Sequence, residues 1–130
     1  MPYTGRVWDV EFVPDVEQWY LGLVESDPAT AALIEQAVDR LAEDGPMLGR
    51  PLVDRIKRSG HHNMKELRPA STAASEVRIL FVFDPRRTAV LLVAGDKAGQ
   101  WNRWYEQAIP VADRRYDEHL ATLAEEEGKS

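Results

Sequence analysis

The feature that most constrains the fold is a run of nine residues, 76–84, in which both alternating sets of side chains are largely apolar. One set is Val77, Ile79, Phe81 and Phe83, and the other is Arg78, Leu80 and Val82. Since successive side chains of a strand point to opposite faces, this run predicts a central strand covered on both sides. A similar run, 89–94, follows the turn residues 84–87, so the two runs predict an antiparallel hairpin.

Two further strands and three helices are predicted around this hairpin. Residues 7–13 alternate as an amphipathic strand, and 64–68 form a third short strand run before the hairpin. Residues 15–24 and 28–44 have helical spacing, and Asp27-Pro28 gives the second helix a cap and a first-turn proline. Helical spacing returns at Trp101, Pro110 could open the final helix, and we expect residues 121–130 to form a frayed tail. The stretch 47–63 is expected to be a loop.

This order predicts one α+β domain over residues 1–130. We expect a mainly antiparallel sheet of about four strands, with two N-terminal helices and a C-terminal helix packed against one side. A chain of 130 residues is long enough to bury a core of its own.

Composition excludes several classes of protein. The sequence has no cysteine, which excludes disulfides and thiolate metal sites. It has neither an apolar run of about 20 residues for a membrane span nor an N-terminal signal sequence, so we expect a cytoplasmic protein without a membrane partner. GxSxG, Walker, GxGxxG and HExxH patterns are absent, which gives no support to the corresponding hydrolases, nucleotidases, dinucleotide enzymes and zinc proteases.

The net charge of −6 is distributed very unevenly. Residues 1–54 hold three Lys/Arg against eleven Asp/Glu, whereas residues 55–115 hold twelve against six, a net charge of +6. Residues 116–130 are acidic again, with one against five. A basic middle between acidic ends favours one face suited to phosphate, although solvated faces can also differ in charge by chance.

Four cations in or beside the strand runs are candidates for phosphate binding. They are Lys65, Arg68, Arg78 and Lys97. Strand alternation places Lys65 and Arg68 on opposite faces of a regular strand, so they cannot both act from one face. Arg78 could instead form a structural ion pair with Glu66 or Glu76, and Lys97 could be an ordinary surface lysine.

Histidine and aromatic side chains supply the other candidates. His62 could transfer a proton near neutral pH, or it could be an exposed loop residue. Trp101, Trp104 and Tyr105 could stack on nucleotide bases, or they could anchor the last helix in the core. The tyrosine hydroxyl could also transfer a proton. The adjacent histidines His61 and His62 lack a third ligand at metal-binding spacing, so no metal site is expected.

Several segments together resemble the toxins of bacterial type II toxin–antitoxin modules. They are Leu48-Gly49-Arg50-Pro51, Lys65-Glu66-Leu67-Arg68, residues 76–81, Leu91-Leu92-Val93 and Lys97. The sequence is most similar to the HigB-like, phage Gp49-like branch of the RelE/ParE superfamily, over roughly residues 7–120.

The resemblance implies a RelE-like fold with a curved sheet and a toxin that cleaves mRNA, commonly on the ribosome, without a metal or cofactor. Lys65, Arg68, Arg78 and Lys97 match the basic positions of such toxins, with Lys65, His62 and Tyr105 as candidates for proton transfer. Arg55, Lys57, Arg58, Trp101 and Trp104 would contact the RNA. The implied partner is a HigA-like helix-turn-helix antitoxin, through which alone the toxin would reach operator DNA.

Two other functions remain open at this point. A toxin of the same fold could act by binding, as ParE-like members do with DNA gyrase. Alternatively, the chain could be a non-catalytic module whose acidic helices and basic sheet serve in the assembly of a complex.

Overall fold

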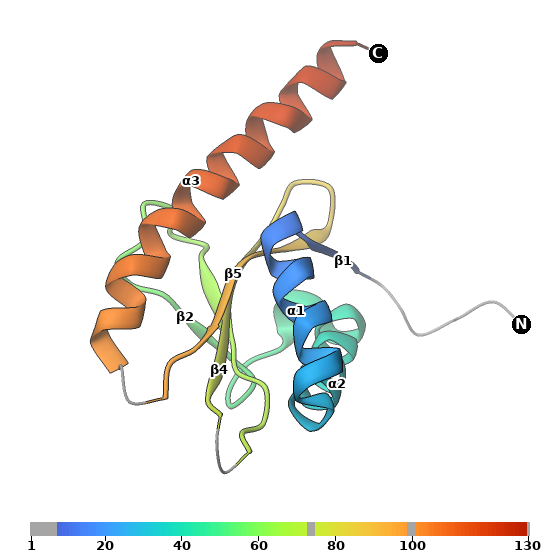
Figure 1. Ribbon diagram of the computed structural model, residues 1–130. Helices are drawn as coiled ribbons and strands as arrows, with labels where there is room; N and C mark the ends of the chain where they lie inside the picture. The colour runs from blue at the N-terminus through green and yellow to red at the C-terminus, as the bar shows by residue number, and fades with distance from the viewer. Residues whose placement is uncertain (1–7, 73–74, 99–100, 130) are drawn as a thin grey trace, which may run out of the picture.

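The computed structural model describes residues 8–72, 75–98 and 101–129 of the chain. The elements are β1 (Asp9–Phe12), α1 (Pro14–Ser26), α2 (Pro28–Asp44), a 3₁₀ turn (Gly45–Met47), β2 (Val53–Arg55), β3 (Lys65–Leu67), β4 (Val77–Phe83), β5 (Thr88–Asp96) and α3 (Trp101–Gly128). The predicted α+β class is therefore confirmed (Figure 1). Val7, which the sequence places in the first strand, lies outside the described residues.

The strands form one mixed sheet in the order β1-β5-β4-β3-β2. β1 runs parallel to β5, and the other three neighbouring pairs are antiparallel. The sequence predicts four of these strands but not β2, which has only three residues inside a stretch expected to be a loop. A strand of three residues has almost no periodicity of its own. β2 is recognised as a strand only by its pairing with β3.

Helices cover both faces of the sheet, so the prediction that they pack against one side is wrong (Figure 1). α1 and α2 pack on the face that includes Ile79, Phe81 and Leu91. α3 packs on the opposite face, against Leu80 and Leu92. The physical reason is the double apolar pattern of the central strands, because each apolar face must be buried against another element.

The predicted start and end of α2 are both confirmed. The Asp27 side chain accepts a hydrogen bond from the backbone N–H of Thr30 at 3.3 Å, and Pro28 follows at the first helical position. The helix ends at Gly45, whose φ of 55° favours glycine. A Cβ at Gly45 would also lie 2.1 Å from Nε1 of Trp8, so this helix end needs a residue without a side chain.

α3 is one continuous helix from Trp101 to Gly128, with Pro110 inside it rather than at its start. Pro110 is exposed and costs the helix one backbone hydrogen bond. The segment expected to be a frayed tail is helical as far as Gly128, and Figure 1 shows this end of α3 extending beyond the sheet. It contacts the β4–β5 turn through Arg86, whose Nη1 lies 2.6 Å from Oε2 of Glu126.

Candidate active site

A cation-rich cavity of about 350 Å³ lies between the β2–β3 strands and the first turns of α3. We call it the basic pocket. Its lining residues are Arg55, Ile56, Lys57, Arg58, Glu66, Arg68, Lys97, Asn102, Tyr105 and Ile109. Six of the eleven candidate residues from the sequence therefore share one cavity: Arg55, Lys57, Arg58, Arg68, Lys97 and Tyr105.

The carboxylate of Glu66 is the acidic group in the wall of this pocket. Glu66 lies opposite Leu80 in the sheet register, so strand alternation turns its side chain toward α3, where it is only 2% exposed. The Tyr105 hydroxyl donates a hydrogen bond to Oε2 of Glu66 at 2.6 Å. Nε of Arg68 donates to the other oxygen, Oε1, at 2.7 Å. These charge-assisted hydrogen bonds fix the carboxylate in one orientation.

Arg68 is held by two carboxylates. Its Nη2 lies 2.6 Å from Oε1 of Glu66 and 3.2 Å from Oδ2 of Asp54. Burial acts against the charge of Arg68, but the adjacent carboxylates, chiefly Glu66, outweigh it and raise the pKa of the guanidinium. Arg68 is therefore a permanent cation in the pocket wall.

Lys97 is buried, with an exposed fraction of 3%, which excludes the alternative of an ordinary surface lysine. Its Nζ lies 3.5 Å from Oε1 of Glu76 and 5.4 Å from the centre of the Tyr105 ring. Burial and the neighbouring charge of Arg78 lower the pKa of Lys97, although Glu76 and Glu66 oppose the shift. An ammonium with a lowered pKa gives up its proton more readily than an exposed lysine.

Arg78 forms the ion pair that the sequence leaves open as an alternative. Its Nη2 lies 3.1 Å from Oε1 of Glu76, and its Nη1 donates to the carbonyl oxygen of Val77 at 2.8 Å. Nε of Arg78 is buried and has no acceptor among the described residues. Arg78 does not line the cavity, and it acts on the pocket through its charge near Lys97 and Tyr105.

Burial and the hydrogen bond to Glu66 raise the pKa of Tyr105 well above its usual value of 10.0. Its hydroxyl is therefore protonated at neutral pH and acts as a hydrogen-bond donor rather than as a base. Trp104, next to it, is partly buried and packs against the core under α3, where a Cβ at Gly95 would lie 2.4 Å from its Nε1. The structure thus favours the anchoring alternative for Trp104, while the side chain of Trp101 lies outside the described part of the chain.

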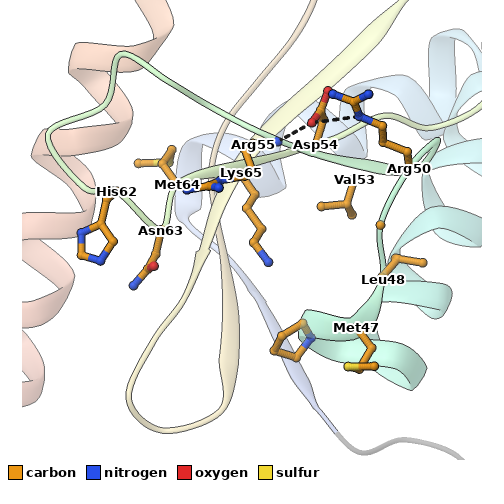
Figure 2. A pocket seen from close by; sticks show the side chains of 12 residues that line it. Met47, Leu48, Arg50, Val53, Asp54, Arg55, His62, Asn63, Met64 and Lys65 are labelled. Carbon is orange, nitrogen blue, oxygen red and sulfur yellow. Dashed lines mark hydrogen bonds and ion pairs between the residues drawn. The ribbon is translucent and has the colours of Figure 1, made fainter.

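Two predicted residues lie on the other side of the β2–β3 strands. Lys65 points away from Arg68, as strand alternation predicts, and its Nζ lies 5.6 Å from the centre of the Phe83 ring. Lys65 and the exposed His62 line a second cavity, drawn in Figure 2, rather than the basic pocket. The structure therefore does not bring Lys65 or His62 to the carboxylate of Glu66.

The loop between β2 and β3 is fastened to α3, which positions Lys57 and Arg58 in the pocket wall. Asp113 on α3 accepts hydrogen bonds from the Ser59 hydroxyl and from the backbone N–H of Gly60, the latter at 2.8 Å. One turn later, Asp117 lies 2.7 Å from Nε2 of His61. Two acidic residues of α3 thus determine where the basic loop lies.

The arrangement combines a carboxylate, a buried ammonium and several guanidinium groups around one cavity. Cations of this kind bind a phosphate group, and the fixed carboxylate can accept a proton from a group beside it. Among the described residues, no cluster of three or more His, Cys, Asp or Glu side chains is suited to a metal ion. Within the same residues, no helix is long and apolar enough to cross a membrane.

Sequence reasoning missed Glu66 and Asn102 as pocket residues. The sequence signal for Glu66 was strand alternation in the run 64–68, which places its side chain on the face opposite Lys65. Its burial could not be seen locally, because Tyr105, the residue that covers it, is 39 positions away.

Comparison with known proteins places residues 22–117 in the family described as phage derived protein Gp49-like. A Mycobacterium tuberculosis protein named "Putative toxin HigB3" is 50% identical over 113 residues, which cover 87% of this chain and 94% of that protein. A second protein of the same organism, "Putative toxin HigB2", is 49% identical over 123 residues. That match covers 92% of this chain but only 60% of the relative.

Proposed function

Because this chain belongs to the family of phage-derived Gp49-like proteins and is a HigB-like toxin of a toxin–antitoxin system, we propose that it is an endoribonuclease that cleaves mRNA and so inhibits translation. The family confirms the resemblance that the sequence segments indicated. The observation that carries the proposal is the buried carboxylate of Glu66, held among the cations of the basic pocket.

In this proposal the pocket cations bind the phosphodiester at the cleaved bond. Arg68 and Lys97 contact the phosphate from the pocket wall, and Lys57 and Arg58 bind the RNA backbone at the loop. Arg78, whose charge acts on Lys97, adds to the stabilisation of the developing negative charge. Cations already fixed in a partly buried site stabilise such charge without reorganising during the reaction.

The cleavage uses the 2′-hydroxyl of the RNA as its nucleophile. Glu66 takes the proton of that hydroxyl as the 2′-oxygen forms a bond to phosphorus. The bond from phosphorus to the 5′-oxygen of the next nucleotide then breaks, and Lys97 donates a proton to the leaving oxygen. The products are a 2′,3′-cyclic phosphate and a free 5′-hydroxyl. Acid–base assistance of this kind contributes about 10²–10⁴-fold to the rate.

Tyr105 has a positioning role in this scheme, because its raised pKa keeps it protonated and its hydroxyl orients Glu66. Lys65 and His62, which the sequence suggests for proton transfer, have no part in the chemical step because they line the other cavity. We further propose that a HigA-like helix-turn-helix antitoxin silences the toxin, that operator DNA is reached only through it, and that the ribosome presents the mRNA.

The proposal is tested by inducing the wild type, Glu66→Gln and Arg40→Gln separately in cells. Arg40 is an exposed cation on α2 that pairs with Asp44 at 3.1 Å and does not line the basic pocket, so Arg40→Gln controls for a glutamine substitution outside the pocket. We expect growth arrest and cleaved transcripts with the wild type and Arg40→Gln, and intact transcripts with Glu66→Gln at equal protein level.

Primer extension on transcripts, repeated with purified toxin and RNA with and without ribosomes, then locates the cuts and shows whether ribosomes are needed. Growth arrest with intact mRNA would contradict the nuclease and favour a toxin that acts by binding. The absence of toxicity from all three proteins would favour a non-catalytic module.

A further inference from the structure

The second cavity, of about 470 Å³, is also built from β2, β3 and the segments around them, and Lys65 lines it from the strand face opposite Glu66. We call it the Lys65 pocket (Figure 2). Its lining residues are Pro46, Met47, Leu48, Gly49, Arg50, Val53, Asp54, Arg55, His62, Asn63, Met64 and Lys65. Arg55 lines both cavities, and it lies on β2, the last strand of the sheet.

Two cations face each other across the strands at this pocket. Arg55 on β2 lies directly opposite Lys65 on β3 in the sheet register. Like charges at directly opposite positions destabilise a sheet. Burial and the charge of Arg55 both lower the pKa of Lys65. Neither side chain forms an ion pair with a described acidic residue.

The acidic residue in the lining is already occupied. Oδ1 of Asp54 lies 3.3 Å from Nε of Arg50, and its Oδ2 lies 3.2 Å from Nη2 of Arg68. Figure 2 shows the Asp54–Arg50 pair at the rim, while the Lys65 side chain extends into the open space of the pocket. An anion from outside the chain would therefore meet Lys65 without competing with a bound carboxylate.

The remaining lining suits a nucleotide base rather than a bare phosphate. Leu48, Val53 and Met64 are buried and give the pocket an apolar wall. Met47 stands at its edge with an exposed fraction of 89%, a large apolar side chain that the fold itself does not use. The amide of Asn63 and the imidazole of His62 supply hydrogen-bonding groups on the other side.

We propose that the Lys65 pocket binds a nucleotide of the RNA adjacent to the cleaved bond, with its phosphate on Lys65 and Arg55 and its base against Met47 and Leu48. The inference rests on the proposed function, since it extends the path of the RNA from the basic pocket around the edge of β2. Arg55, which lines both cavities, bridges the two nucleotide sites. Lys65 is then a substrate-binding residue that sets the length of RNA the toxin prefers.

The test compares Lys65→Gln, Lys65→Arg and the control Arg40→Gln in binding a fluorescent single-stranded RNA, each in a Glu66→Gln background that prevents cleavage. A lost phosphate contact on single-stranded nucleic acid reduces the slope of log K against log salt by about 0.7. We expect this loss in Lys65→Gln only, with Lys65→Arg and Arg40→Gln keeping the slope of the parent.

A kinetic arm uses the cleavage-competent forms with two substrates, a dinucleotide and an oligonucleotide that extends it on both sides. We expect Lys65→Gln to lower kcat/KM for the long RNA about tenfold through KM while leaving the dinucleotide unchanged. Equal losses on both substrates, or an unchanged salt slope in Lys65→Gln, would overturn the pocket assignment while leaving the nuclease intact. RNA that is bound with the expected slopes but never cut would overturn the nuclease and support the pocket.

An acidic peptide added as a competitor shows whether the Lys65 pocket binds RNA or a protein partner. Equal displacement of the RNA from the Glu66→Gln parent and from its Lys65→Gln variant agrees with a nucleotide site, because the peptide then does not depend on Lys65. Tight peptide binding that requires Lys65, together with RNA binding that does not, would assign the pocket to a protein partner and overturn the proposal.

Discussion

The Tyr105 hydroxyl and Oε2 of Glu66 are joined by a hydrogen bond of 2.6 Å that connects α3 to β3 across 39 positions of sequence. This bond fixes the proposed proton acceptor, and it also closes the sheet face over a carboxylate that is only 2% exposed. In the proposed mechanism, both the stability of the fold and the cleavage of RNA therefore depend on this pair of side chains.

Replacing Glu66 by Gln is expected to remove the proton acceptor while keeping the shape of the side chain. We expect kcat for RNA cleavage to fall by about 10²–10⁴-fold, with the dissociation constant for RNA unchanged or lower because one negative charge is lost. Single-turnover cleavage and RNA titration measure the two quantities separately. A variant that keeps wild-type kcat would assign proton transfer to another group.

Replacing Tyr105 by Phe is expected to leave Oε2 of Glu66 without its donor in a buried position. Such an unsatisfied group costs about 1–3 kcal/mol, so we expect the free energy of unfolding to fall by that amount in urea titrations. The double variant Glu66→Gln/Tyr105→Phe should lose less free energy of unfolding than the sum of the losses in the two single variants. Strict additivity would show that the two side chains are not coupled.

The sequence predicted the strand pattern of this site better than its chemistry. Strand alternation within 64–68 correctly places the side chains of Lys65 and Arg68 on opposite faces, because this period of two can be read from the local sequence. Glu66 gave no sign of being buried, because a carboxylate between Lys65 and Leu67 looks like an ordinary solvent-facing position. Its cover comes from Tyr105 on a helix far along the chain, and no local pattern records such a contact.

The sequence also contains the information that both faces of the sheet are covered. Residues 77–83 are apolar on both faces, which already requires a layer on each side, yet the helices were expected on one side only. The long C-terminal helix supplies the second layer, whereas Pro110 suggests a later start for it. The three-residue β2 could not have been found, because its pairing with β3 and not its own sequence makes it a strand.

Gly95 allows α3 to approach β5 closely, since a Cβ there would lie 2.4 Å from Nε1 of Trp104. We expect Gly95→Ala to lower the free energy of unfolding in urea titrations by about 1–3 kcal/mol, as overpacked cores do. A Cβ at Gly22 in α1 would have no atom within 4 Å, so Gly22→Ala is the matched control and should stabilise by about 0.5–1 kcal/mol. Trp104→Leu should partly rescue Gly95→Ala, and a failure to do so would place the strain elsewhere.

Asp113 is expected to control RNA binding from outside the pocket, because it holds the loop that carries Lys57 and Arg58. We expect Asp113→Ala to raise KM for RNA roughly tenfold, equivalent to about 1.4 kcal/mol and close to the value of one hydrogen bond to a charged group. kcat should change little. Glu118→Ala, an exposed carboxylate on the same helix, is the control. A fall in kcat with unchanged KM would contradict a role in placing the loop.

Activity at alkaline pH should depend on Lys97, because burial and Arg78 lower the pKa of its ammonium below the usual 10.5. As a proton donor it is effective only while charged, so we expect kcat to fall as the pH rises through this lowered pKa, before Tyr105 with its raised pKa ionises. Lys97→Arg keeps the positive charge but does not release a proton in this range. We therefore expect that variant to retain RNA affinity, to lose about 10²-fold in kcat and to lack the alkaline decline. If the decline persists in Lys97→Arg, the leaving oxygen receives its proton from a different group, and Lys97 acts only as a phosphate contact.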